Sequence, residues 1–259
     1  MDARIILPVA PLRKYIRFFW LLENNSADII EKFKVIPDGA PGLVFQENPA
    51  VVYKDNQTLP TSFLFGQATQ YLEMSARGHF RNIGVSFQPT ALQPVFGVAA
   101  SELTQRHIDL NDLLYTSISE QLMNESSTTG RIAALEQFFL RLTANSKSED
   151  DQVRYAIRQF QQGGELKQVQ TALQISERSL ERMFKKHVGL SPKLYARICR
   201  FQATLKALRT TPVASLTELA YLENYFDQSH FIRDFKFFAG TTPGAFLQDA
   251  KERFPDFSV

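Results

Sequence analysis

One motif occurs twice in the second half of this sequence, and no other feature restricts the possible folds as strongly. Arg182–Pro192 and Arg233–Pro243 share the pattern R-x-F-K-x-x-x-G-x-[ST]-P and lie 51 residues apart. In both copies a glycine stands where a helix must end, because glycine adopts the left-handed C′ conformation without strain. The Ser-Pro or Thr-Pro pair that follows can start the next helix, with a hydroxyl N-cap and proline at the first helical position. The duplication therefore predicts two equivalent helical units.

A short helix and a tight turn are expected before each copy. Val169–Leu173 leads to Ser176, and Leu219–Glu223 leads to Asp227, and both end residues are N-cap candidates. Short helix, turn and longer helix form the helix-turn-helix plan, whose second helix reads bases in the major groove. The connecting helix, Ser191–Arg209, spans roughly 28 Å at about 1.5 Å per residue. Adjacent major-groove segments lie about 34 Å apart, so one duplex can meet both second helices.

Outward-facing residues of the two second helices, the reading helices, are the candidate DNA contacts. In the first reading helix, Arg178 and Arg182 can pair with guanine O6 and N7. Glu181 can accept from cytosine N4 or orient an arginine, and Lys185 and Lys186 suit phosphates. The alternative is an ordinary charged surface helix with i,i+4 pairs.

The second reading helix offers a comparable set. Gln228 and Arg233 can reach bases, whereas Ser229 and Lys236 suit phosphates. His230 is as readily explained by a structural role near the helix start as by a DNA contact.

The two halves of the chain carry opposite net charge. Residues 1–150 hold 13 Lys and Arg against 16 Asp and Glu (net −3), and residues 151–259 hold 16 against 11 (net +5). A basic half is typical of a protein that binds a polyanion, although a solvated basic face gives the same count.

The first 90 residues are expected to form strands. Short apolar runs alternate with turn signals, and Ile83–Phe87 shows the period of two that a half-buried strand requires. The other runs are Leu43–Phe45, Val51–Tyr53 and Phe63–Phe65, and the turn signals are Pro37–Gly39 and Glu47–Pro49. This spacing predicts a small β-barrel or sandwich. Its aromatic residues either line an effector cavity or simply fill the core: Trp20, Phe33, Phe45, Phe65 and Phe87.

Helical periodicity replaces the strands after residue 90. Ala91–Ala100, Leu110–Leu122 and Arg131–Leu142 have helical spacing, and the last carries one apolar stripe. This stripe either forms a dimer contact or packs against its own domain: Ile132, Leu135, Phe139 and Leu142. The polar stretch Thr143–Asp151 is typical of a linker. We therefore expect an α+β chain: a β-rich domain over 1–145, a linker over 146–152 and an all-α seven-helix domain over 153–254.

Several classes of protein are disfavoured. We find no P-loop, dinucleotide-binding glycine pattern, Gly-x-Ser-x-Gly or paired-cysteine motif, so we expect no enzyme activity and no cofactor. His79 and His107 are too sparse for a metal site. The lone Cys199 is most simply a buried small hydrophobe. No apolar run reaches about 18 residues and no secretory signal is evident, so we expect a cytoplasmic protein without membrane partners.

The helical half resembles the AraC/XylS family of bacterial transcription regulators. The resemblance covers about Asp151–Leu247, and its most specific part is Phe226–Lys236 followed by Gly240–Phe246, which is similar to the family signature over the second reading helix. The sequence departs from the family at the two tight turns, where Gln174 and Asn224 replace the usual glycine. Asparagine tolerates left-handed geometry well, whereas glutamine costs about 1 kcal/mol there.

The N-terminal half carries a shorter resemblance. Pro37–Gly39 and Gly84–Pro89 look like parts of the cupin-like sensor domains that some family members carry. The resemblance implies a regulator that binds operator DNA, with effector sensing or dimerisation in the N-terminal half, and RNA polymerase as a partner if it activates. Two alternatives stay open: an effector-independent regulator whose N-terminal domain only oligomerises, and a small-molecule enzyme or binding protein with an accessory helical domain.

Overall fold

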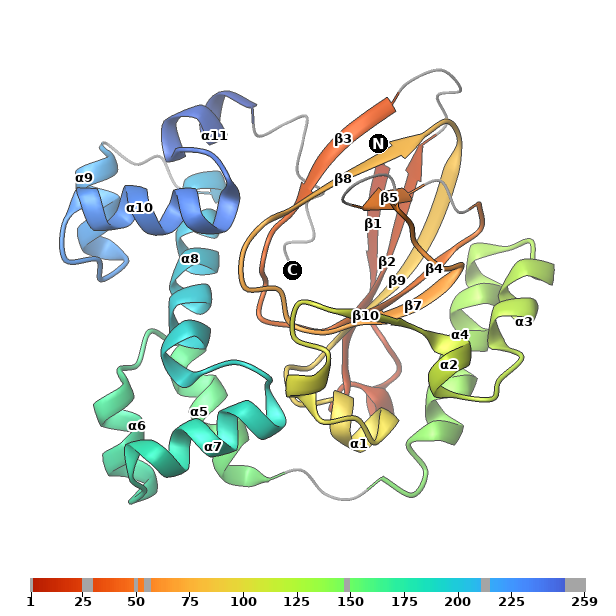
Figure 1. Ribbon diagram of the computed structural model, residues 1–259, viewed down its shortest axis with the longest axis horizontal. Helices are drawn as coiled ribbons and strands as arrows, with labels where there is room; N and C mark the ends of the chain where they lie inside the picture. Colours follow the sequence, from red (N-terminus) through yellow and green to blue (C-terminus); the bar gives the residue numbers. More distant parts are fainter. Residues whose placement is uncertain are drawn as a thin grey trace.

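The computed structural model describes residues 2–24, 30–48, 51–53, 57–146, 150–210 and 215–249. A β-rich N-terminal domain with a few helices lies beside a C-terminal domain made only of helices (Figure 1). This arrangement confirms the expected α+β organisation. The expected strand at Val51–Tyr53 is present as backbone, and residues 250–254, expected at the end of the last helix, lie outside the described residues.

The N-terminal domain is built from two sheets whose strands pair antiparallel. The larger sheet has the strand order β1-β2-β9-β4-β7-β10, and the smaller one has the order β3-β8-β5-β6. The strands are β1 (Asp2–Ile6), β2 (Ile16–Asn24), β3 (Ile30–Val35), β4 (Gly42–Gln46), β5 (Val51–Tyr53), β6 (Gln57–Thr58), β7 (Ser62–Phe65), β8 (Leu72–Arg77), β9 (Phe80–Phe87) and β10 (His107–Asp109).

The alternation along β9 divides the larger sheet into two faces. Ile83, Val85 and Phe87 belong to a core that lies between this sheet and the helices, whereas Phe80 belongs to a second core between the two sheets. Gly84 points into this second core, where the indole of Trp20 covers it so closely that a Cβ would lie 1.8 Å from the ring. The sheet is therefore buried on both sides.

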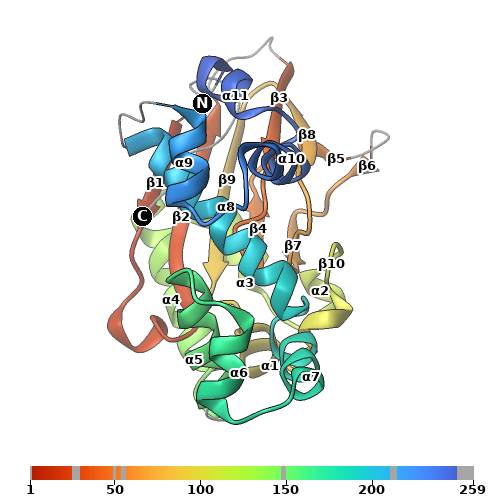
Figure 2. The ribbon, with the colours of Figure 1, turned by 90° about the vertical axis from the view of Figure 1, so that its left-hand side faces the viewer.

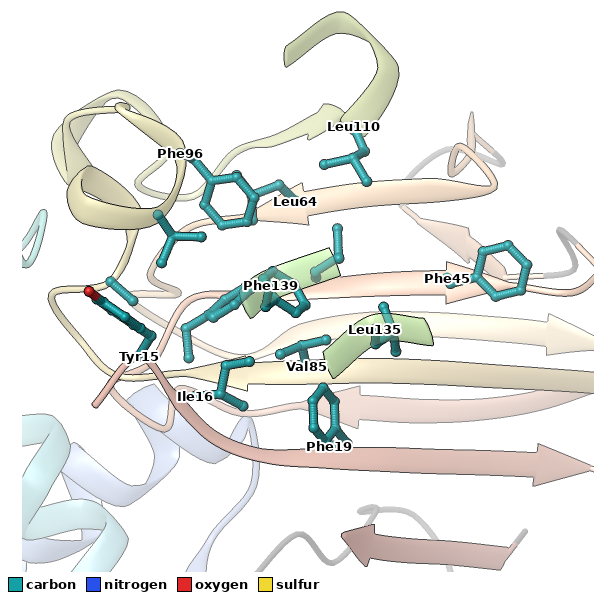
Figure 3. Packing of buried hydrophobic residues seen from close by; sticks show 14 of the residues in the cluster. Tyr15, Ile16, Phe19, Phe45, Leu64, Val85, Phe96, Leu110, Leu135 and Phe139 are labelled. Atoms are coloured by element: carbon teal, nitrogen blue, oxygen red, sulfur yellow. The ribbon is translucent and has the colours of Figure 1, made fainter. Parts of the chain in front are cut away.

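Four α-helices and two short 3-10 turns cover the face of the larger sheet that points away from the smaller sheet. They are η1 (Ala10–Leu12), α1 (Leu92–Phe96), η2 (Ala100–Glu102), α2 (Leu110–Leu113), α3 (Ile118–Asn124) and α4 (Thr128–Leu142). Figure 3 shows Phe96 of α1 and Leu135 and Phe139 of α4 packed with Phe19 and Val85 of the sheet.

The apolar stripe of α4 is part of this core. Ile132, Leu135 and Phe139 are at most 7% exposed, and Leu142 packs against the same cluster. The stripe therefore packs against its own domain, as one of the two alternatives held, and does not offer a free surface for a second chain.

The five aromatic residues proposed for an effector cavity lie on two different faces. Trp20, Phe33 and Phe65 belong to the core between the two sheets. Phe45 and Phe87 belong to the core under the helices, and Phe87 packs edge-on against Phe96 and Phe139. A single cavity lined by all five is thus ruled out, because strand alternation sends Phe45 and Phe87 to the opposite side of the sheet.

The described part of the C-terminal domain contains the seven predicted helices. They are α5 (Asp151–Gln161), α6 (Leu166–Leu173), α7 (Glu177–His187), α8 (Pro192–Thr210), α9 (Leu216–Leu222), α10 (Gln228–Ala239) and α11 (Pro243–Asp249). Asp150 caps α5 by accepting from the Gln152 amide, so this helix begins two residues before the domain boundary expected at 153.

The two tight turns have the same backbone design. Gln174 and Asn224 both adopt left-handed φ, at 54° and 57°, as the missing family glycines imply. In each turn this residue donates three residues back, and the next one, Ile175 or Tyr225, donates five residues back, at 2.8–3.2 Å. The second turn has one additional residue, Phe226, which is 86% exposed. Equivalent positions are therefore 50 residues apart before the turns and 51 after them.

Candidate DNA-binding surface

The outer face of α7 carries the charged residues expected from the sequence. Arg178, Glu181, Arg182, Lys185 and Lys186 are all exposed in the structure. The opposite face is buried through Leu180 and Phe184, both 0% exposed, and Ser176 caps the helix by accepting from the Ser179 amide. The helix therefore has an anchored apolar face and a free, mainly cationic one.

The outer face of α10 is similar in plan. Ser229, Arg233 and Lys236 are exposed, and Asp227 caps the helix by accepting from the His230 amide at 2.6 Å. Gln228 is half-buried, because the Thr217 hydroxyl of α9 bonds its side-chain oxygen at 2.9 Å. Three of the four predicted side chains are thus exposed, and Gln228 is held by its own helix-turn-helix unit.

His230 lies on the inner side of α10. Its ring packs edge-on against Tyr225 at 5.5 Å, and Nε2 lies 3.8 Å from a carboxylate oxygen of Asp234. These contacts favour the structural role over a DNA contact.

Asp234 joins the second unit to the connecting helix α8, a role that the sequence did not reveal. Its carboxylate is 7% exposed and accepts two hydrogen bonds from Arg197, at 2.8 and 3.3 Å, with Arg200 at 3.8 Å. Arg200 also lies over the Tyr225 ring at 4.6 Å and donates to the Asn224 carbonyl. The orientation of α10 relative to α8 is therefore fixed by charge as well as by apolar packing.

An aromatic cluster performs the same task in the first unit. Phe160 of α5, Phe184 of α7 and Tyr195 of α8 lie 5.4–6.5 Å apart between ring centroids. Burial raises the pKa of Tyr195 and raises that of Cys199 to about 12, so this thiol stays protonated. Cys199 packs against the C-terminal core as a small side chain, but it is only partly buried, whereas the sequence predicted a buried one.

Both reading helices end at the N-terminal domain (Figure 1). The Thr104 hydroxyl donates to the carbonyl of Gly189 at the end of α7, and Lys34 donates to the carbonyl of Gly240 at the end of α10, at 2.8 and 3.1 Å. The repeated glycines of the sequence motif are therefore also the points where the N-terminal domain contacts the two units.

A third contact reaches the connecting helix. Gln202 of α8 donates to the Pro37 carbonyl, Ile36 packs against the C-terminal core, and Gly39 lies against the Tyr195 ring. The predicted turn at Pro37–Gly39 is thus part of the contact between the domains.

The described part of the chain contains neither a metal-binding cluster nor a membrane-spanning helix. No group of three or more His, Cys, Asp or Glu side chains there is arranged to hold a metal ion. None of the helices among the described residues combines enough length with enough apolar character to traverse a lipid bilayer.

Two family models match the sequence. One, described as a helix-turn-helix domain, covers residues 170–249, and the other, described as a domain of unknown function (DUF6597), covers residues 4–109. The first match covers the two capped helix-turn-helix units, which the helix α8 connects. Together, the match and this architecture define the class of the protein, a DNA-binding regulator. The matched segment runs from within α6 to the end of α11 and so contains both reading helices. No curated protein matches the sequence.

The solved structures that match this chain share little sequence with it. ToxT from Vibrio cholerae is 10% identical with a TM-score of 0.49, over 88% of this chain and 98% of that one. The xylose-binding transcription activator XylR is 21% identical with a TM-score of 0.32, over 46% of this chain and 38% of that one. The AraC-like transcriptional activator CuxR is 12% identical with a TM-score of 0.28, over 80% and 87%.

Proposed function

We propose that this protein is a sequence-specific transcription regulator that reads one operator with α7 and α10 together. The observation that carries the proposal is the pair of equivalent reading helices, each with a buried apolar face and an exposed polar or cationic one. Arg182 and Arg233 hold the same motif position in the two helices and read bases. Lys185, Lys186 and Lys236 contact phosphates on either side.

Arginine-to-alanine variants test this proposal. Arg182→Ala and Arg233→Ala should each lose about 1–3 kcal/mol of specific binding, or roughly 5- to 150-fold in affinity. Arg158→Ala is the matched control, because Arg158 is an exposed arginine of the same domain that belongs to neither reading helix. Fluorescence anisotropy with DNA from upstream of the neighbouring genes gives the affinities, and circular dichroism verifies folding. Equal affinity for the three folded variants would refute the assignment.

The N-terminal domain, in this proposal, senses a small molecule between its two sheets. On the face of the larger sheet that packs against the smaller sheet, three buried polar atoms have no hydrogen-bond partner among the described residues: Gln46 Oε1, Asn82 Oδ1 and Ser86 Oγ. Such atoms are costly to bury unsatisfied, and a ligand that donates hydrogen bonds satisfies them. Trp20, Phe33 and Phe65 supply apolar surface on the same side.

A metabolite screen by thermal shift tests the sensing role. A true effector should raise the melting temperature and change operator affinity in the wild type. Asn82→Ala should abolish both responses, whereas Asn111→Ala, at an exposed position on α2, should retain them. Retention of both responses by Asn82→Ala would place the effector elsewhere, and a broad panel without a response would favour the regulator whose N-terminal domain only oligomerises.

A further inference from the structure

A groove runs along the connecting helix α8 between the two helix-turn-helix units. It encloses about 940 Å³, and we call it the connector groove. Its floor is α8, and its walls come from the end of α5 and the start of α6 on one side and from α10 and the turn before it on the other. In Figure 2, α8 crosses obliquely between α6 below and α9 and α10 above. The groove thus lies between the parts of the protein that meet successive turns of DNA.

Cationic side chains follow the floor of the connector groove. Lys193, Arg197 and Arg200 line it from α8, four and three residues apart, which places them along one side of the helix. Arg233 of α10 lines the wall. Because Arg233 also belongs to the exposed face of a reading helix, the groove opens onto the surface that meets DNA.

The acidic residues of the groove only partly offset these cations. Asp234 is buried beneath Arg197 and Arg200, and Glu165 and Glu223 lie on the walls, with the partly exposed His230 near Asp234. Arg200 retains a buried Nε without a partner among the described residues. Lys193 and Arg233 remain as exposed cations at the rim.

The shape of the floor suits a close approach of another backbone. Ala196 lies on α8 between Lys193 and Arg197, and Ala203 lies one turn after Arg200. Gly163 and Gly164 form the wall before α6. These small side chains leave an open path between the charged groups. The first helix of a helix-turn-helix unit ordinarily crosses the DNA backbone, and α6 holds that place beside the groove.

We propose that the connector groove receives the sugar-phosphate backbone of the operator where the minor groove faces the protein, between the two major-groove contacts. The inference rests on the proposed function, because it requires both reading helices on one duplex. Phosphate contacts carry no base information, so this groove supplies affinity and fixes the spacing of the two units rather than selecting bases.

Two lysines of α8 give a matched test. Lys193 lines the groove and Lys206 does not, and both are exposed on the same helix. Lys193→Ala should weaken binding several-fold, equally for operator and unrelated DNA, and should lower the slope of log K against log salt by about 0.9 for each phosphate that the protein no longer neutralises. Lys206→Ala should leave both quantities unchanged. Identical behaviour of the two variants would overturn the inference, even if Arg182→Ala still lost operator binding.

Directed cleavage locates the groove on DNA. An iron–EDTA reagent is attached to Ala203→Cys in a Cys199→Ala background, because the native Cys199 is only partly buried and lines the same groove. The operator should be cut between the two protected half-sites, whereas the same reagent on Lys206→Cys should cut elsewhere or not at all. Cleavage by the Ala203→Cys conjugate outside that interval, or no cleavage despite binding, would contradict the proposal. Inorganic phosphate gives a further control. If it raises the melting temperature of the wild type but not of Lys193→Ala, while no cleavage occurs between the half-sites, the groove binds free phosphate and not the operator backbone, and the proposal is contradicted.

Discussion

Replacing Gly189 by alanine tests whether the N-terminal domain holds the end of the first reading helix. Gly189 has a φ of +85°, and a Cβ there would lie 2.7 Å from the Ala100 carbonyl oxygen and 2.7 Å from the Thr104 hydroxyl. Gly163 is the matched control, because its φ is +83° and the nearest atom to a Cβ lies 3.9 Å away. Both variants place alanine in the same backbone conformation, and only one collides with the other domain.

The expected losses differ by the cost of that collision. Left-handed alanine costs about 1–2 kcal/mol. A more restricted unfolded chain returns about 0.4–1 kcal/mol, so Gly163→Ala should lose about 1 kcal/mol. Gly189→Ala adds about 1–3 kcal/mol of overpacking against backbone that cannot rotate away. It also strains the hydrogen bond from Thr104 to the Gly189 carbonyl, worth about 1 kcal/mol. Its total loss should be about 2–5 kcal/mol, unless the domains separate first.

Scanning calorimetry and small-angle scattering distinguish these outcomes. At about 2–4 °C per kcal/mol for a chain of this size, Gly163→Ala should lower the melting temperature by a few degrees. Gly189→Ala should lower it clearly more, or should split the transition and increase the radius of gyration as the domains part. Equal melting temperatures and equal radii for the two variants would refute the reasoning, because the end of α7 would then not be in contact with the N-terminal domain in solution.

Four further substitutions test two ion pairs and the strain of one backbone position. The hydrogen bond from buried Arg131 is the main cause of the lowered pKa of Glu47. The ionised carboxylate therefore stabilises the fold at pH values above the ordinary carboxyl pKa. This stabilisation is lost as the pH falls through the lowered pKa. Glu47→Gln should therefore cost about 1–3 kcal/mol at pH 7 in urea titrations, and the difference from wild type should shrink in acid; a constant difference would contradict this assignment. Asp234→Ala should lower the free energy of unfolding by about 2 kcal/mol. This is less than the loss expected for a fully buried ion pair, because Arg197 and Arg200 are partly exposed. Unchanged stability would show that apolar packing alone holds α10. Gln174→Gly should stabilise the protein by about 0.5 kcal/mol, because glycine adopts the left-handed φ of this position without strain. Asn224→Gly should be nearly neutral, because asparagine tolerates this φ well. Equal effects of the two variants would show that Gln174 is not strained.

The helical half was predictable because its determinants are local. Caps, C′ glycines and tight turns act over three to five residues, so Ser176, Asp227 and Gly240 could be assigned from the sequence alone. Even the unusual Gln174 turn followed from its alignment with a position that requires left-handed backbone. Asp234 was missed for the converse reason. Its partner Arg197 lies 37 residues away on another helix, and an aspartate inside a helical pattern gives no local sign of such a bond.

The N-terminal half was less predictable because its two cores differ only in long-range packing. Alternation indicates that Phe87 shares a side of its strand with Ile83 and Val85, but not which layer covers that side. The pairing of β2 with β9 and of β4 with β9 decides this. The paired residues are 38 to 71 positions apart in sequence, at Phe45↔Ile83, Leu43↔Val85 and Ile16↔Phe87. The proposed aromatic cavity therefore divided between two faces once the pairing was known.

The positions of the interdomain contacts constrain how the N-terminal domain can act on DNA binding. Lys34 and Thr104 bond the terminal carbonyls of the two reading helices, and Gln202 ties the connector between them to Pro37. A rearrangement of the N-terminal domain therefore acts on both helices and on their spacing at once. With each hydrogen bond worth about 1 kcal/mol, breaking two or three changes the balance by an amount comparable to typical allosteric coupling, about 1–3 kcal/mol. A regulator built this way needs no large movement, because a small change in spacing suffices to prevent two reading helices from entering one duplex together.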